Sequence, residues 1–264
     1  QEETREEERK EMTRKAFLIS MTLLLAASCA GRKSTLRLER ADQIITHQVQ
    51  YGETWATIAE DFYDDESRGS DLARYNGGDP ESQPEPGSGI RIPLQRRDVR
   101  MLRSKLDAAD IYNEGLDLVS DGDYAGAIEK FRNSLELDPG LSEASFNLAV
   151  TYQKLGLHER AATVLEGLVT REPDNPEYLF AQGHAYFHIG DLSRAEEAFL
   201  DALLIDSNHL KALFSLATVY EKAGDLEKAA NRLAEYIVRE PDGEWSAEAR
   251  ERLDRVNRAR KEQR

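Results

Sequence analysis

Residues 176–209 read PEYLFAQGHAYFHIGDLSRAEEAFLDALLIDSNH, and residues 210–243 read LKALFSLATVYEKAGDLEKAANRLAEYIVREPDG. When the two stretches are aligned, small residues, glycines and aromatic residues fall at the same places. The same marks recur upstream without gaps, so that the period of 34 residues covers four ranges: 108–141, 142–175, 176–209 and 210–243. A fixed period of this length indicates stacked copies of one supersecondary unit.

Five aligned columns carry the period. They are Gly115, Ala149, Gly183 and Ala217; Gly122, Gly156, Gly190 and Gly224; Ala127, Ala161, Ala195 and Ala229; Phe131, Leu165, Phe199 and Leu233; and Pro139, Pro173 and Pro241, with Ser207 in the third copy. A small residue in the first column lets two helices cross closely, where a large side chain would overpack. The second column supplies the left-handed residue that ends a helix, and the prolines stop the next one. Each copy is therefore predicted to be a helical hairpin.

These columns resemble the tetratricopeptide repeat (TPR) family. The resemblance implies a mainly α fold, in which four hairpins over residues 108–241 stack into an α-solenoid with a concave face. Residues 95–107 are expected to form a helical linker into the first repeat. The charged residues 244–264 are expected to form a capping helix.

The concave face of such a solenoid is the expected place for a protein partner. Aromatic residues recur near the front of each first helix, and polar or small residues lie beside them or one turn further on. The predicted groove residues are Tyr112, Asn113, Phe146, Asn147, Val150, Phe180, His184, Phe214 and Thr218. An aromatic row with amide neighbours suits an extended or helical peptide. The alternative is that the aromatic column packs between helices.

Residues 47–94 form a different segment, with a strand before Tyr51-Gly52, two short helices, a Pro/Gly-rich loop and a closing strand at Ile90–Pro93. The motifs V49-x-x-G52-E53-T54-W55-x-x-I58-A59-x-x-F62-Y63, L72-x-x-Y75-N76 and G89-I90-R91-I92-P93 resemble the LysM family. The resemblance implies a β-α-α-β domain that binds N-acetylglucosamine polymers, which means peptidoglycan in a secreted bacterial protein. Two positions depart from the family: Glu53 replaces the usual aspartate, and Gly69 replaces a frequent tryptophan.

In that family the sugar lies between two loops. Carried over to this sequence, one side of the predicted peptidoglycan site is Gly52, Glu53, Thr54 and Trp55, and the other is Gly87, Ser88, Gly89 and Ile90. Amide groups on a glycine-rich turn can approach an acetamido carbonyl without a side chain in the way. Two alternatives stay open: Trp55 is a core-packing residue, or the domain keeps the fold without affinity for sugar.

The first 46 residues predict export. A short positive region follows Met12, then the apolar run 16–27 and the small residues around Cys29, which is the layout of a secretory signal peptide. Leu25–Cys29 resembles a bacterial lipobox, so residues 1–29 are predicted to be an upstream extension and a lipoprotein signal, with lipidation at Cys29. Cleavage after Ala30, which would release a soluble secreted protein, is the alternative. Residues 30–46 would form a tether that links the lipid anchor to residues 47–94. The expected location is the periplasm, with the anchor in the outer membrane.

Composition excludes several functional classes. The formal net charge of -15 and the pI near 4.9 argue against nucleic acid as a partner. No phosphate loop, dinucleotide fingerprint or nucleophile elbow occurs, so no enzymatic activity and no cofactor are expected. His184 and His188 are four residues apart, but no glutamate follows His184 and no third ligand is near in the sequence, so no metal site is predicted.

The sequence therefore favours a non-enzymatic envelope scaffold that binds peptidoglycan and recruits an envelope protein. Two other functions remain open. One is a lipoprotein assembly factor for a pilus or secretion machine, and the other is a regulator of a peptidoglycan synthase or hydrolase.

Overall fold

The structure is a computed structural model, and it describes residues 43–262. The chain divides into two compact units, with the boundary between Asn113 and Glu114. The predicted signal peptide, the predicted lipidation site Cys29 and most of the predicted tether lie outside the described residues. None of the helices within residues 43–262 has the length and apolar character needed to span a bilayer.

The first unit begins with strand β1 (Gln43–Gln48), followed by helix α2 (Trp55–Tyr63), the 3-10 turn η2 (Glu66–Arg68) and helix α3 (Gly69–Tyr75). Strand β2 (Gly89–Leu94) closes the unit and pairs antiparallel with β1, with Gln48 opposite Gly89 and Gln43 opposite Leu94. Both helices pack with the sheet around a core that contains Ile58, Leu72 and Ile92. The order of elements is strand, helix, helix, strand.

Strand β1 begins four residues earlier than the sequence suggested. The sequence predicts a tether over residues 43–46, but these residues lie in the β-ladder, and Ile45 is almost fully buried opposite Ile92. The β-branched pair Ile44-Ile45 suits a pleated, half-buried surface, which explains why this part of the expected tether is a strand.

Gly69 has a packing role that the family comparison did not suggest. A Cβ atom at this position would lie 2.8 Å from the backbone nitrogen of Ala56 and 2.8 Å from the carbonyl carbon of Trp55. The start of α3 therefore approaches the backbone of α2 too closely for any side chain.

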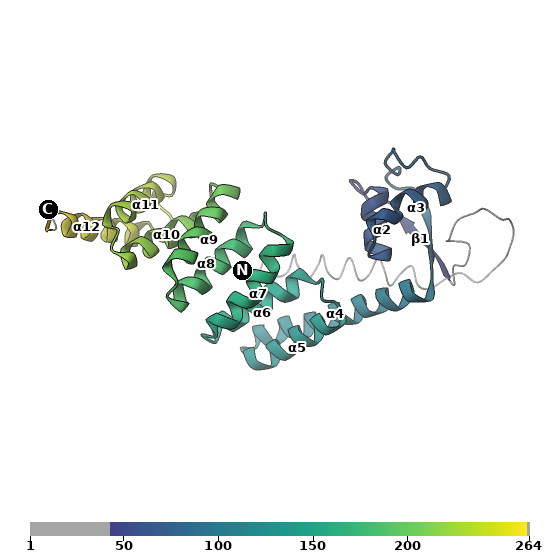
Figure 1. Cartoon of the computed structure of the whole chain (residues 1–264), viewed down its shortest axis with the longest axis horizontal. Helices are drawn as coiled ribbons and strands as arrows, with labels where there is room; N and C mark the ends of the chain where they lie inside the picture. The colour runs from purple at the N-terminus through teal and green to yellow at the C-terminus, as the bar shows by residue number, and fades with distance from the viewer. Residues whose placement is uncertain (1–42, 263–264) are drawn as a thin grey trace. The chain divides into compact units, whose positions relative to one another are not determined.

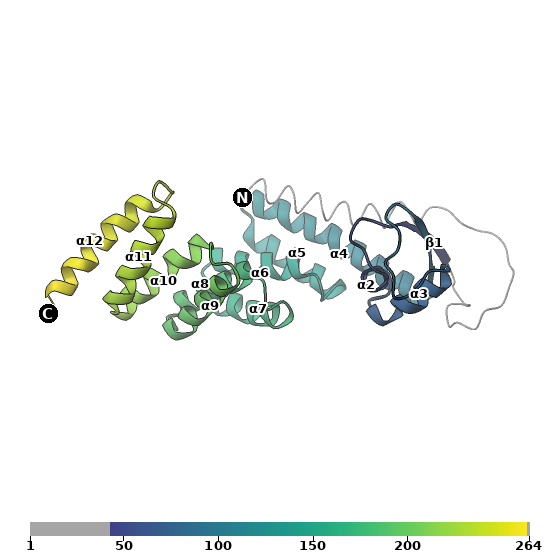
Figure 2. The ribbon, with the colours of Figure 1, turned by 90° about the horizontal axis from the view of Figure 1, so that it is seen from above.

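Helix α4 (Arg96–Ser120) contains both the predicted linker and the first helix of repeat 1. The remaining helices are α5 (Tyr124–Leu137), α6 (Ser142–Lys154), α7 (His158–Arg171), α8 (Pro176–Ile189), α9 (Leu192–Ile205), α10 (Leu210–Ala223), α11 (Leu226–Arg239) and α12 (Ser246–Glu262). From α5 onward, consecutive helices pack on one another along the chain, and Figures 1 and 2 show them as successive antiparallel hairpins.

The recurring glycines and small residues occupy the places that the period predicts. Gly190 and Gly224 adopt φ values of 94° and 79° directly after α8 and α10, the left-handed conformation that glycine adopts without strain. Where α8 crosses α9, a Cβ on Gly183 would lie 2.7 Å from the ring of Phe199. The helical-hairpin solenoid predicted from the sequence is confirmed.

Aspartates start three of the second helices. The carboxylates of Asp123, Asp191 and Asp225 each accept a hydrogen bond from a backbone amide three residues on, at 3.0–3.1 Å. An N-cap of this kind satisfies an otherwise free amide at a helix start and stabilises the helix by about 1 kcal/mol. In repeat 2 Leu157 stands at the corresponding place without a side-chain cap, and His158 follows it.

Candidate functional site

The turn after β1 is closed by one carboxylate. Glu53 Oε2 accepts a hydrogen bond from the backbone amide of Gln50 at 2.6 Å and lies 2.8 Å from His47 Nε2. His47 is itself 7% exposed, with its ring edge-on to Phe62. Glu53, predicted to contact sugar, thus holds the turn in shape through partners of its own. Thr54 has a comparable role, because its hydroxyl caps α2 in a capping box with Thr57.

The two predicted sides of the peptidoglycan site lie side by side. The amide of Val49 donates to the carbonyl of Ser88 at 2.9 Å, and the amide of Gly87 donates to the carbonyl of Val49 at 2.8 Å. Gly52 and Gly87 both have positive φ and open space around the position of a Cβ. Next to Gly52, Tyr51 is 96% exposed in the same turn. The sequence analysis did not select this ring, although its place next to the Gly52 turn was a usable signal.

Trp55 and Ile90 lie in the core. They are 7% and 5% exposed, and a Cβ on Gly78 would lie 2.8 Å from Cζ2 of the Trp55 ring. Their side chains therefore pack inside the domain, and only their backbone atoms could contact a ligand. For Trp55 this agrees with the alternative interpretation as a core-packing residue.

The aromatic column of the repeats packs between helices. The ring of Phe146 lies 5.1 Å from that of Tyr178, and Phe180 lies 5.8 Å from Phe199 and 5.0 Å from His209. Centroid separations of this size are typical of favourable aromatic pairs. Each ring is only half-buried, but one side of it is occupied by a neighbouring helix or turn.

The capping helix covers the last member of the column. Trp245 lies 5.2 Å from Phe214, and the guanidinium of Arg252 lies 4.6 Å above the same ring. Arg252 also donates to Thr218 Oγ1 at 2.8 Å and pairs with Glu221 at 2.9 Å. Two predicted groove residues of the fourth repeat, Phe214 and Thr218, are therefore engaged by α12.

The other predicted groove residues differ in accessibility. Asn147, Val150 and His184 are half-buried on α6 and α8, and Asn147 Nδ2 donates to the carbonyl of Glu143 at 3.0 Å. Tyr112 and Asn113 are the last two residues of the first unit. Tyr112 is fully buried, so its ring is not available to a partner. The aromatic period alone does not reveal this burial.

Three histidines meet near the C-terminal end of α8. His184 Nε2 and His188 Nε2 are 3.2 Å apart, and the ring of His158 stacks on that of His188 with centroids 4.5 Å apart. Desolvation, helped by His188, His158 and Lys154, lowers the pKa of His184 from 6.5 to about 4. Desolvation, then His158 and Lys222, also lower the pKa of His188. Over residues 43–262, no group of three or more His, Cys, Asp or Glu side chains is arranged as a metal site.

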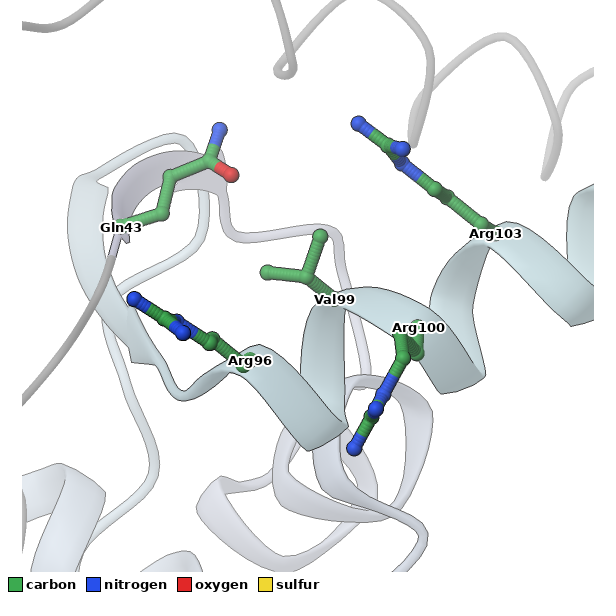
Figure 3. A pocket seen from close by; sticks show the side chains of 5 residues that line it. All are labelled: Gln43, Arg96, Val99, Arg100 and Arg103. Atoms are coloured by element: carbon green, nitrogen blue, oxygen red, sulfur yellow. The ribbon is translucent and has the colours of Figure 1, made fainter.

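The first unit also contains a shallow hollow, which the sequence analysis did not predict. It lies between the start of β1 and the first turns of α4 and is lined by Gln43, Arg96, Val99, Arg100 and Arg103 (Figure 3). The three arginines share one face of the helix because they stand at positions i, i+4 and i+7. Their charge suits an anionic group, in a chain whose net charge is strongly negative.

Comparison with known families identifies the repeats. Two tetratricopeptide repeat models match residues 118–184 and 180–244. The TPR repeat-containing protein YpiA of Bacillus subtilis is 27% identical over 143 residues, which is 53% of this chain and 34% of YpiA. The photosystem I assembly protein Ycf3 of a Synechococcus strain is 34% identical over 87 residues, which is 32% of this chain and 50% of Ycf3. The chain thus spans half or less of these relatives.

Solved structures agree on the fold. MamA from Desulfovibrio magneticus superposes with a TM-score of 0.51 at 24% identity, over 56% of this chain and 83% of MamA. A tetratricopeptide repeat protein from Parabacteroides merdae gives a TM-score of 0.53 at 15% identity, over 59% of this chain and 60% of its own. Residues 118–244 of this chain are tetratricopeptide repeats.

Proposed function

We propose that the protein is a non-enzymatic scaffold of the bacterial cell envelope, which binds peptidoglycan through its first unit and a protein partner through its repeats. Tetratricopeptide repeats indicate a protein-interaction role, which is the general part of this proposal. The wall ligand, the lipid anchor at Cys29 and the periplasmic, outer-membrane location are its specific parts. They draw on the LysM resemblance and on the signal-like residues 12–30.

The observation that carries the peptidoglycan proposal is the paired glycine turns of the first unit. Gly52 and Gly87 leave the backbone of two adjacent loops open, and the 96% exposed ring of Tyr51 stands beside them. Sugar rings present C–H faces that pack on aromatic rings, while exposed amides meet the acetamido oxygen. Glu53 and Thr54 position this surface rather than contact the sugar, because both side chains have intramolecular partners.

For the protein partner, the accessible part of the predicted groove is on α6 and α8. Asn147, Val150 and His184 are half-buried there, whereas Arg252 and Trp245 occupy the fourth repeat. A partner segment would therefore lie over the second and third repeats. This places the partner on the second unit and the wall polymer on the first, so that attachment to the wall raises the local concentration of the partner.

The direct test is co-sedimentation of residues 30–264 with purified peptidoglycan sacculi. Tyr51→Ala should lower the affinity about fivefold, the equivalent of about 1 kcal/mol, without changing the unfolding temperature. Glu60→Gln, an exposed position on the outer side of α2, is the matched control and should bind as the parent does. Sedimentation of the parent chain that is no greater than that of a chain lacking residues 47–94 would remove the wall-binding half of the proposal.

One observation favours an assembly factor as the second candidate. The photosystem I assembly protein Ycf3 is similar to about a third of this chain. An assembly role predicts that crosslinking in the envelope captures a stable complex with subunits of one multimeric machine. A scaffold that regulates wall enzymes predicts instead a change in the rate of a synthase or hydrolase when the protein is added.

A further inference from the structure

The geometry of the histidine pair on α8 suits a ligand of its own, although one member, His184, also lies in the proposed partner groove. The Nε2 atoms of His184 and His188 face each other 3.2 Å apart, and both residues lie on one face of the helix. A metal ion about 2.05 Å from each nitrogen would make an N–metal–N angle of about 103°, close to the tetrahedral angle of about 109° that zinc prefers.

We propose that His184 and His188 form a two-nitrogen chelate for a divalent transition-metal ion of the copper or zinc class. The rings are inclined at 52°. For both Nε2 lone pairs to face one ion, each ring would rotate about its Cβ–Cγ bond from this arrangement. Solvent molecules complete the coordination, because no third protein ligand is placed there among the described residues.

The pair is accessible to an ion. His188 is exposed on α8, so an ion can reach the two Nε2 atoms from solvent without opening the fold.

The residues around the pair and the preference of imidazole nitrogen together indicate which ion is expected. His158 stacks on His188 with an interplanar angle of 12° and so fixes the orientation of that ring. Lys154 and Lys222 lie close enough to lower the pKa of His184 and His188, and their positive charge also opposes a bound cation. Hard ions such as Mg²⁺ and Ca²⁺ prefer oxygen ligands. Imidazole nitrogen favours Cu²⁺ over Zn²⁺ in affinity.

The test is calorimetric titration of the untagged full chain with ZnCl₂ and with CuCl₂ at pH 7.5. All variants carry Cys29→Ser, so that the thiol does not bind metal. We expect one equivalent of each ion and no binding of MgCl₂. Loss of a hydrogen-bond partner behind a metal ligand weakens binding about 10–100-fold, so loss of a ligand itself, in His184→Gln or His188→Gln, should weaken it at least about tenfold.

His158→Gln is the matched control, because it removes a ring of the same cluster and keeps both ligands. Its affinity should stay within about threefold of the parent, well short of the loss of a ligand. Equal loss of binding in His158→Gln, or unchanged binding in His184→Gln and His188→Gln, would overturn the assignment. Electron paramagnetic resonance of the Cu²⁺ complex of the parent chain tests it without any substitution: couplings to two imidazole nitrogens are expected, and a spectrum without them contradicts the chelate.

Discussion

The two units are held together in different ways. In the repeats one contact recurs with the period: a basic side chain lies over the rings of Tyr152, Tyr186 and Tyr220 in turn, at 5.9, 4.3 and 4.9 Å from the ring centroid. In the first unit each tie occurs once, such as the Glu53 carboxylate that closes the turn after β1. Loss of one repeated contact leaves its counterparts in place, whereas loss of a single tie leaves its turn or helix end without a substitute.

The largest expected effect is on the core of the repeats. Phe199 is 1% exposed and packs on Gly183, so Phe199→Ala should lower the free energy of unfolding by about 3–5 kcal/mol. Calorimetry should show a lower transition for the second unit and an unchanged one for the first. Leu204→Ala is the control on the same helix, because Leu204 is 83% exposed and its loss should change stability by less than about 0.5 kcal/mol. Equal shifts of both transitions would show that the two units do not unfold separately.

In the first unit, the single side chain of Asn76 makes several hydrogen bonds to the backbone. Its amide donates to the carbonyls of Leu72 and Arg91, at 3.0 and 2.9 Å, and its oxygen accepts from the Arg91 amide at 2.7 Å. Asn76→Ala leaves the Arg91 groups unpaired and should cost about 2–3 kcal/mol in this unit. Asn231→Ala, on the exposed face of α11, is the control for the repeats. A small loss in Asn76→Ala would contradict the idea that single ties decide the stability of the first unit.

The histidine cluster predicts an acid-sensitive second unit. The pKa of His184 is lowered from 6.5 to about 4 in the fold, so on acidification the unfolded chain takes up a proton before the folded one does. Stability is therefore fully present above pH 6.5 and falls between pH 6.5 and 4. The loss is about 2 kcal/mol after allowance for the partial exposure of the ring. Denaturant unfolding with a chelator present should show a shallower pH dependence in His184→Gln than in the parent, and identical slopes would refute the prediction.

The smallest expected changes in stability come from alanine substitutions at two helical glycines, and the two changes have opposite signs. Gly183→Ala should destabilise the repeats by about 1 kcal/mol, because its Cβ would lie 2.7 Å from the Phe199 ring. Gly167 in α7 has open space around it, so Gly167→Ala should stabilise by about 0.5–1 kcal/mol through helix propensity. Thermal unfolding of the two variants measures both. The same sign for both would mean that the small-residue column does not mark close helix crossings.

The period made the repeats predictable, because each structural requirement appears several times in the sequence. The glycine after the first helix of a hairpin, as at Gly190 and Gly224, has the positive φ that its recurrence implied. What the period did not reveal is which side of a half-buried ring is covered. Phe214 looked like a groove residue, but α12 covers it, and this depends on the charged residues 244–262, which follow no repeat pattern.

In the first unit, too, the sequence pattern did not reveal how residues that occur only once pack. The motif positions indicated the order of strands and helices and left open whether Trp55 faces the core, but they did not indicate that Gly69 admits no side chain. Both depend on how closely two helices approach, a distance that no local pattern contains. The histidine pair is similar: the spacing of four residues gave the shared helix face, whereas the contact with His158 required α7 to be packed beside α8.

The central claim, that the first unit presents a sugar-binding surface, is tested most directly by nuclear magnetic resonance. Residues 30–264, labelled with nitrogen-15, would be titrated with an N-acetylglucosamine oligomer while backbone amide shifts are followed. The account predicts saturable shifts confined to residues 50–55 and 86–90, with none in the repeats, and their loss in Tyr51→Ala. Amide shifts that stay unchanged at saturating oligomer, or that change only within residues 114–262, would contradict it.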